Sequence, residues 1–391
     1  MEPRRLACRI GAGLSTGGSA WDAATEAARE ARAGVVGREE VDLAFIFLSA
    51  THLDEAGEAA EAVREELAPR HLLGCVAEGV LARARELEQG PAVAVWAAGL
   101  PGGQIECFHL AAAETADGVT VAGVPEFEQP GLVALLVDPF TFPAGPFLAS
   151  LNEAHERIPL VGGLAVGGRR PGSQALILDD WVYAEGAVGA VVSGYPVLTV
   201  VSQGCRPIGR EAVITSCEDN LVHELAGQPA LEHLRRLIAG LSSEDRALAA
   251  RGLLVGLVID ENQPAYETGD FLMRGLLGAD EASGALALGD TVRVGQTLRF
   301  FARDAASADT DLRRALEGAL GEARPAGALL FTCNGRGTNM FPEPNHDARL
   351  VAETLGTQAL AGFFCGGEIG PVGGKAFLHG FTATLAVFLE P

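Results

Sequence analysis

The sequence predicts a mixed α/β protein, built from duplicated strand–helix–hairpin units that form two layered domains with a cleft between them. Short apolar runs typical of buried strands alternate with segments whose apolar residues recur at helical spacing. Glycine accounts for 50 of the 391 residues, nearly twice its usual share of roughly 7%, which indicates many tight turns. One order of elements recurs three times along the chain, as expected for repeated units that pack against one another.

The first copy follows an amino-terminal strand and helix. The strand is expected at Arg5–Ile10, and Ser19 is expected to cap an alanine-rich helix that ends near Ala33. The copy then contains a strand, a helix, a glycine-bearing segment and two strands paired as a hairpin across a Gly-Leu-Pro-Gly-Gly turn. Their expected ranges are Asp42–Ser49, His52–Leu67, Leu72–Val80, Ala92–Ala98 and Gln104–Ala111.

The second and third copies repeat this order. The second is expected at Gly131–Asp138, Pro146–Arg157 and Leu160–Gly168, followed by a hairpin of Ala175–Val182 with Ala187–Ser193. The third is expected at Ala326–Cys333, Asn345–Leu355, Leu360–Ile369 and Thr382–Leu389.

A shared glycine supports the repeat. Aligning Leu72 with Leu160 also aligns Gly74 with Gly162, and the third copy carries Gly362 at the matching place. The distances from Leu43, Gly131 and Ala326 to the glycine of the same copy are 31, 31 and 36 residues. This self-similarity indicates duplicated α/β units that pack against one another.

A connecting region, Ser202–Ala308, separates the second copy from the third. It is expected to hold a helix at Pro229–Gly240 and strands at Leu253–Asp260 and Asp290–Arg303. The domain limits that we predict are 1–30 for the amino-terminal strand and helix, 31–225 for the first domain and 226–391 for the second.

Charge and cysteine content exclude several classes of function. A net charge of −22 argues against nucleic acids and anionic membranes, which both select clustered Lys and Arg. The seven cysteines are scattered and never in C-x-x-C spacing, which predicts a reducing compartment without a zinc ribbon. The amino terminus lacks an apolar signal-peptide core, so we expect a cytoplasmic protein.

The segment Gly362–Phe381 is the most informative in the chain. Glycines beside Glu368 allow close backbone approach, while Glu368 brings a carboxyl group into an apolar setting. Gly367 and Glu368 are therefore candidate ligand-binding residues. His379 could contact a ligand, bind haem iron, or be a core histidine satisfied by a backbone carbonyl.

Two further turns follow apolar strands. The Cys333–Gly337 turn contains Asn334 and Arg336, and the guanidinium fork of Arg336 suits a carboxylate or phosphate. The alternative is a structural pairing of Arg336 with Glu368 or Asp304. Arg206 follows Cys205 in a similar glycine- and proline-flanked turn, and the cysteines are expected to be small buried apolar residues.

Five ordered motifs resemble the FIST family, in which a FIST N domain precedes a FIST C domain. They are VSQGCRPIG with NLVHELAGQPALEHL, FLMRGLLGAD, VGQTLRFFARDA, FTCNGRGTNMF and GFFCGGEIGPVGGKAFLHGFTATL. The resemblance implies an intracellular bacterial sensory module that binds small ligands such as amino acids. It also implies a separate signalling protein as partner, because no output domain is recognisable here. Some relatives are implicated in haem and nitric oxide sensing.

The leading hypothesis is a non-enzymatic sensor for an amino acid or other small carboxylate. Arg336 and Arg206 would bind the carboxylate and Glu368 the amine, and the glycine loops would supply backbone N–H groups. One alternative is haem binding through His379 or another histidine, although no cofactor is expected. The other is an enzyme that uses Cys333 or Cys205 with Glu368. No metal site is predicted, because the histidines lack ligand spacing.

Overall fold

The structure is a computed structural model that describes residues 9–35, 40–115, 118–127, 131–266 and 268–390. Its mixed α/β class, with several sheets and a two-domain layout, confirms the prediction. The contacts divide the chain into two compact units. The first unit contains Met1–Val201, Arg313–Leu378 and Thr382–Pro391, and the second contains Ser202–Leu312 with His379–Phe381. The cleft between domains stays a prediction.

The first unit consists of three repeats of the predicted order. Repeat 1 contains β2 (Leu43–Ser49), α2 (Ala56–Leu67), β3 (His71–Ala77), β4 (Val80–Ala82), β5 (Arg85–Leu87) and β6 (Val93–Gly99). Repeat 2 contains β9 (Leu132–Val137), α3 (Ala144–Ala154), β10 (Leu160–Leu164), β11 (Leu176–Leu178), β12 (Trp181–Tyr183) and β13 (Ala187–Ser193). Repeat 3 contains β22 (Pro325–Cys333), α7 (His346–Leu355), β23 (Leu360–Cys365), β24 (Glu368–Val372), β25 (Lys375–His379) and β26 (Ala383–Leu389).

Other elements flank the repeats. They are β1 (Arg9–Ser15), α1 (Ala20–Gly34), the 3₁₀ helix η1 (Ala50–Glu55), β7 (Gln104–Thr115), β8 (Gly118–Ala122), β14 (Val197–Ser202), α6 (Ala305–Leu320) and the 3₁₀ helix η3 (Gly337–Asn339). Ser19 caps α1 as predicted, because its hydroxyl accepts a hydrogen bond from the Asp22 N–H at 3.1 Å. The predicted strand at Arg5–Ile10 lies largely outside the described residues, and β1 continues to Ser15. Helix α6 is not among the predicted elements.

Each repeat gives its hairpin to the sheet of another repeat. Within a repeat, the two strands that flank the helix are parallel, and the last strand pairs antiparallel with the first. The hairpin β4–β5 of repeat 1 joins β23 of repeat 3, β11–β12 of repeat 2 joins β3 of repeat 1, and β24–β25 of repeat 3 joins β10 of repeat 2. The exchange is therefore cyclic. The sheet orders are β1-β6-β2-β3-β11-β12, β14-β26-β22-β23-β4-β5 and β25-β24-β10-β9-β13-β7-β8.

Two predicted hairpins are wrong. Strand β6 pairs with β1 and β2, whereas β7 pairs with β13 and β8, so the turn at Gly99–Gly103 connects two different sheets. Likewise, β13 pairs with β9 and β7 rather than with β11 or β12. A glycine-rich turn predicts a change of direction, but it does not say which sheet the next strand enters.

The motif glycine occupies the same place in all three repeats. Gly74, Gly162 and Gly362 sit on the second parallel strand, each opposite a residue of the first strand. A Cβ atom added to them would lie 2.2, 1.8 and 1.7 Å from the carbonyl oxygen of Ile46, Leu135 and Leu330, respectively. A side chain at these positions would therefore push the parallel strands apart.

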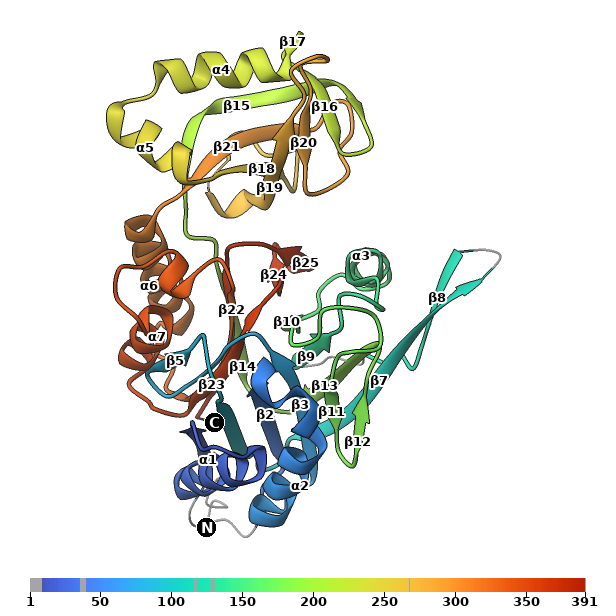
Figure 1. Cartoon of the computed structure of the whole chain (residues 1–391), viewed down its shortest axis with the longest axis vertical. Helices are drawn as coiled ribbons and strands as arrows, with labels where there is room; N and C mark the ends of the chain where they lie inside the picture. The colour runs from blue at the N-terminus through green and yellow to red at the C-terminus, as the bar shows by residue number, and fades with distance from the viewer. Residues whose placement is uncertain (1–8, 36–39, 116–117, 128–130, 267, 391) are drawn as a thin grey trace. The chain divides into compact units, whose positions relative to one another are not determined.

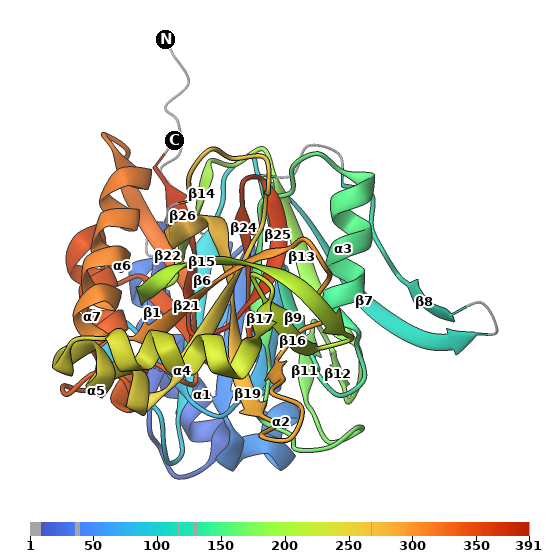
Figure 2. The same cartoon turned by 90° about the horizontal axis from the view of Figure 1, so that it is seen from above.

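The three sheets share one apolar core, and helices cover their outer faces. Along β2, Leu43, Phe45 and Phe47 enter the shared core, while the alternate residues contact α1 and α2. Figure 1 shows α1 and α2 side by side over this sheet. Helix α3 covers the sheet of repeat 2 in the same way, and α7 packs on β22. The hairpin β7–β8 projects away from the rest of the first unit in both views (Figures 1 and 2).

The second unit is a sheet closed on itself. Its elements are β15 (Cys205–Glu218), β16 (Leu221–Leu225), β17 (Gln228–Pro229), α4 (Ala230–Gly240), α5 (Ser243–Arg251), β18 (Leu253–Val258), the 3₁₀ helix η2 (Thr268–Asp270), β19 (Phe271–Ala279), β20 (Leu286–Leu288) and β21 (Thr297–Arg303). The order is β15-β21-β18-β19-β20-β16-β17, and β15 also pairs with β16, which closes the ring. The strand predicted at Asp290–Arg303 begins only at Thr297. Within the described residues, no helix is long and apolar enough to cross a membrane.

We expect Gly362→Ala to destabilise the protein by more than about 3 kcal/mol, because its Cβ would overlap the Leu330 carbonyl. The matched control is Gly145→Ala in α3, where an added Cβ meets nothing within 4 Å. Urea unfolding of both variants measures the difference. Equal unfolding midpoints for Gly362→Ala and the parent would contradict the common role of the motif glycine.

Candidate functional site

The candidate site lies where the two parallel strands of repeat 3 end. Cys333 and Cys365 are the last residues of β22 and β23 and are register partners. The Asn334 N–H donates to the Cys365 carbonyl at 2.9 Å, so the turns that follow the two strands are joined. Ligands of α/β proteins commonly bind at such carboxyl ends of parallel strands.

Arg336 forms a buried ion pair with Asp347 at the start of α7. Nε and Nη2 of Arg336 donate to Oδ2 and Oδ1 of Asp347 at 2.7 and 2.9 Å, and both residues are fully buried. The Thr332 hydroxyl donates to Oδ2 at 2.7 Å, and Nδ1 of His346 lies 3.0 Å from Oδ1. Burial acts to raise the pKa of Asp347, but Arg336 and these hydrogen bonds hold it well below its usual range.

The exchanged hairpin of repeat 1 brings two more carboxyl groups to this turn. Glu88 accepts hydrogen bonds from the N–H and hydroxyl of Thr338 at 2.9 and 2.8 Å. Glu86 is buried, and its Oε1 accepts from the Ala348 N–H at 2.8 Å in the first turn of α7. Burial, together with Asp347, raises the pKa of Glu86 to about 7.

Glu368 is the first residue of β24 and is fully buried. Its Oε2 accepts from the N–H and hydroxyl of Thr382 at 3.1 and 2.8 Å. Its Oε1 has no nitrogen or oxygen donor among the described residues, and the Cys333 thiol donates to the carboxyl group. Burial raises the pKa of Glu368 to about 8, although Thr382, Cys333 and Arg336 oppose this shift. At neutral pH the carboxyl group is therefore mostly protonated.

A glycine opposite Glu368 leaves room for the Cys365 side chain. Gly163 of β10 is the register partner of Glu368. A Cβ atom on Gly163 would lie 2.2 Å from the Cys365 sulfur. The exchange of β24 onto β10 is thus possible only because this position of repeat 2 carries no side chain.

Five of the predicted residues are brought together, and three lie elsewhere in the chain. All five lie at the ends of β22 and β23 or within three residues after them: Cys333, Asn334, Arg336, Gly367 and Glu368. Arg206 belongs to the second unit, where its guanidinium donates to Glu244 at 2.9 Å and lies 3.1 Å from Asp245. Cys205 also belongs to the second unit, and its thiol donates to the Gln203 carbonyl. His379 is the last residue of β25 and is likewise assigned to the second unit. The proposed ligand roles of all eight stay predictions.

Arg336 donates two hydrogen bonds to Asp347, a partner that the sequence did not suggest, and its charge also lowers the pKa of Glu368. Asp347 lies in the first turn of the predicted helix. An acidic residue at that place is the one feature of the sequence that could have indicated a partner for Arg336. Thr382 begins the last predicted strand and gave no signal of its own. Glu86 and Glu88 could not be assigned to this site without knowing that their hairpin joins repeat 3. Within the described residues, no cluster of three or more His, Cys, Asp or Glu side chains could hold a metal ion.

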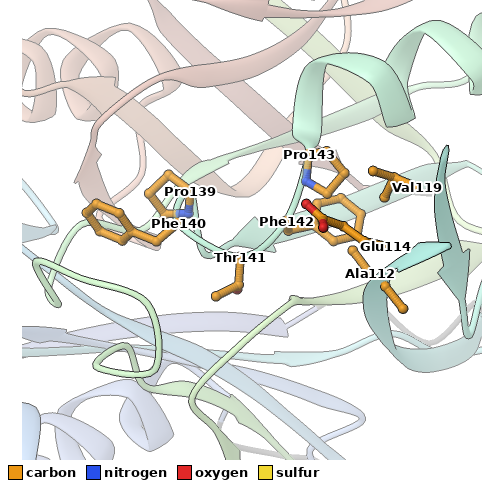
Figure 3. Close-up of a pocket in the computed structure, with 9 residues that line it drawn as sticks. Ala112, Glu114, Val119, Pro139, Phe140, Thr141, Phe142 and Pro143 are labelled. Carbon is orange, nitrogen blue, oxygen red and sulfur yellow. The ribbon is translucent and has the colours of Figure 1, made fainter. Parts of the chain in front are cut away.

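A separate cavity of about 260 Å³ follows β9, at the corresponding end of repeat 2. Figure 3 shows the side chains that gather on one side of it, which are Ala112, Glu114, Val119, Phe142 and Pro143. Phe140 points the other way and is 43% exposed. The carboxylate of Asp138 is fully buried here, but it already accepts from the Phe140 N–H and the Thr141 hydroxyl. This cavity therefore offers both polar and apolar contacts, and its lining includes Glu114 and Thr141.

Comparison with known proteins gives matches along most of the chain. The FIST N domain matches residues 42–228, and the FIST C domain matches residues 230–371. The uncharacterized protein Rv0628c of Mycobacterium tuberculosis is 44% identical over 386 residues, which cover 98% of this chain and all of the relative. The uncharacterized protein Mb0898c of Mycobacterium bovis is also 44% identical over 386 residues, or 98% of this chain and 99% of the relative. The junction of the two matches falls between β17 and α4, inside the second unit.

Asp347→Asn should cost about 3–5 kcal/mol of stability, because it leaves the buried Arg336 guanidinium without its counter-charge. Arg236→Ala is the matched control, since it removes an exposed ion pair with Glu232 and should change stability by less than about 0.5 kcal/mol. Denaturant unfolding at neutral pH compares the two. A small effect of Asp347→Asn would show that the pair does not hold the turn.

Glu368→Gln should alter how stability depends on pH. The ordinary pKa of 4.5 is raised to about 8 in the folded protein, so between these values the folded state keeps a proton that the unfolded state has lost. The parent should therefore lose stability relative to Glu368→Gln as pH rises, by up to about 1.4 kcal/mol per pH unit, and the difference should level off above about pH 8. Unfolding of both proteins from pH 5 to 9 measures this, and a constant difference would contradict the raised pKa.

Proposed function

The chain belongs to the FIST family, whose domains are sensory domains of signal transduction, and we propose that it binds a small ligand whose ammonium group contacts Glu368. An amino acid or a similar small amine fits this chemistry. In this proposal the protein catalyses no reaction, and a separate signalling protein receives the signal.

The buried carboxyl group of Glu368 carries the proposal. Removing a carboxylate from water is unfavourable unless hydrogen bonds or an opposite charge compensate for it. Oε2 has both of its hydrogen bonds from Thr382, but Oε1 has no nitrogen or oxygen donor among the described residues. An ammonium group at Oε1 would supply a hydrogen bond and a positive charge together.

Arg336 has a different role here from the one that the sequence suggested. Two of its nitrogens donate to Asp347, so a ligand carboxylate would have to compete with a buried bidentate ion pair. We therefore propose that Arg336 orders the turn after β22. The N–H groups of Gly335, Arg336 and Gly366 already donate to Cys333 and Leu164, so in this proposal the N–H groups of Gly337 and Gly367 receive the ligand carboxylate.

Binding of an amine should release a proton from Glu368. At pH 7 the carboxyl group, with a pKa of about 8, is mostly protonated, and an ammonium ligand favours its ionised form. The affinity should therefore rise between pH 6 and 8, approaching tenfold per pH unit, and then level off. Isothermal titration with amino acids, in two buffers of different ionisation enthalpy, measures the affinity and the proton release.

Two variants complete the experiment. Glu368→Gln should abolish binding while the protein stays folded, and Glu153→Gln, which changes an exposed glutamate of α3, should bind as the parent does. A thermal-shift screen selects the ligand beforehand, because a ligand at about 100 times its dissociation constant stabilises by roughly 2.7 kcal/mol. Unchanged binding in Glu368→Gln would rule out the proposed contact.

Haem binding remains a separate hypothesis, and the cavities described here do not favour it. The cavity of about 260 Å³ after β9 and one of about 360 Å³ between β1 and α1 contain no histidine in their linings. His379 is 3% exposed, so haem would have to displace its surroundings to reach the imidazole. A Soret band on haem addition, lost in His379→Ala, would support haem binding, and no band would exclude it.

A further inference from the structure

We propose that Cys333 and Cys365 form an oxidisable dithiol, which hydrogen peroxide or an organic hydroperoxide converts into a disulfide. This modification site is independent of the proposed ligand. It rests on the placement of the two thiols at the ends of neighbouring strands and on the groups around Cys333.

The register of the strands brings the two cysteines together. They are partners in the parallel pairing of β22 with β23. Neighbouring strands lie about 4.8 Å apart, which is within the Cα separation of roughly 4.4–6.8 Å that disulfides span. Both side chains also point to the same face of the sheet, because Phe331 and Phe363, two residues earlier on each strand, contact each other in the shared core.

The strand ends are also able to adjust. Cys365 precedes Gly366 and Gly367, and Cys333 lies two residues before Gly335. A disulfide between adjacent parallel strands needs a small movement of the Cβ atoms toward each other. Glycine permits that movement at lower cost than any other residue, because it has the widest range of backbone angles.

Cys333 is the thiol that reacts first. It is 8% exposed, whereas Cys365 is fully buried. The Gly335 N–H points at the Cys333 sulfur at 3.4 Å, which favours negative charge there. The Cys333 thiol donates a hydrogen bond to the Glu368 carboxyl group, which in its ionised form would accept the thiol proton. By contrast, burial raises the pKa of Cys365 well above its usual value. This thiol therefore stays protonated until it attacks the oxidised Cys333.

The chemistry balances in two steps. In the first, the Cys333 thiolate attacks one peroxide oxygen, the O–O bond breaks, and Cys333 becomes a sulfenic acid while the second oxygen leaves as water or alcohol with the thiol proton. In the second, the Cys365 sulfur attacks the sulfenic sulfur, the S–O bond breaks, and the hydroxyl leaves as water with the Cys365 proton. The two thiols lose two electrons in total, and the peroxide gains them.

The other described cysteines provide internal controls. Cys107 of β7 is half-buried and packs against the shared core from a different strand than either cysteine of the pair. Cys205 and Cys217 belong to the second unit. Cys75 of β3 is the competitor to consider, because it is fully buried and close enough to Cys365 to raise the pKa of that thiol.

The experiment maps oxidised cysteines by mass spectrometry. Reduced full-length protein is treated with hydrogen peroxide in the presence of dimedone, remaining thiols are blocked with N-ethylmaleimide, and the protein is digested without reduction. The parent should give a cross-linked peptide pair containing Cys333 and Cys365. Cys365→Ala should instead give a dimedone adduct on Cys333, and Cys107→Ser should behave as the parent does.

Three outcomes would overturn the proposal. One is a parent in which Cys333 remains blocked by N-ethylmaleimide while Cys107 is oxidised. Another is a Cys333 cross-link to Cys75 instead of Cys365. The third is a folded Cys365→Ala protein without a dimedone adduct on Cys333. If Cys365→Ala does not fold, the cross-linked peptide of the parent decides alone. Glu368→Gln should slow the loss of the Cys333 thiol by at least about tenfold, because it removes the proton acceptor.

Discussion

Each sheet of the first unit is completed by a hairpin from a different repeat, and the rest of that unit depends on this exchange. The hairpins β4–β5, β11–β12 and β24–β25 join β23, β3 and β10, respectively. No repeat can therefore cover the edge of its own second strand, and an uncovered strand edge is prone to pair with other chains. The three repeats must consequently fold as one cooperative body.

The same exchange builds the candidate site from separate parts of the sequence. Repeat 3 supplies the strand ends, with Cys333, Arg336 and Cys365, while the hairpin of repeat 1 supplies Glu86 and Glu88. Repeat 2 supplies Gly163, whose missing side chain lets β24 carry Glu368 into the interior. The FIST N match holds repeats 1 and 2, and the FIST C match holds most of repeat 3. Neither part alone would contain the complete site.

The sequence predicted those features that local patterns determine. The Ser19 cap, the strand–helix–strand order and the common glycine at Gly74, Gly162 and Gly362 are encoded by short spacings, and all are present. Strand pairing is a long-range property, so the two hairpins predicted across glycine turns were wrong. For the same reason the sequence could name Cys333 and Glu368 as candidates but could not show that their turns converge, and it did not identify Asp347 or Glu86 as partners. Asp347 becomes a partner because it is buried against Arg336, and Glu86 reaches the site on the hairpin of repeat 1.

Charge balance in the buried cluster determines what a ligand must bring. Arg336 directs two of its nitrogens to Asp347, so Asp347 is the carboxyl group that remains ionised. Glu86 and Glu368 keep their protons to higher pH, with pKa values of about 7 and 8, because burial disfavours further negative charge. A cationic ligand that replaces the proton of Glu368 leaves the net charge of the cluster unchanged. An anionic ligand would add a charge that the single Arg336 guanidinium, already paired with Asp347, does not compensate. The buried electrostatics therefore favour an amine over a simple carboxylate as the group that reaches Glu368.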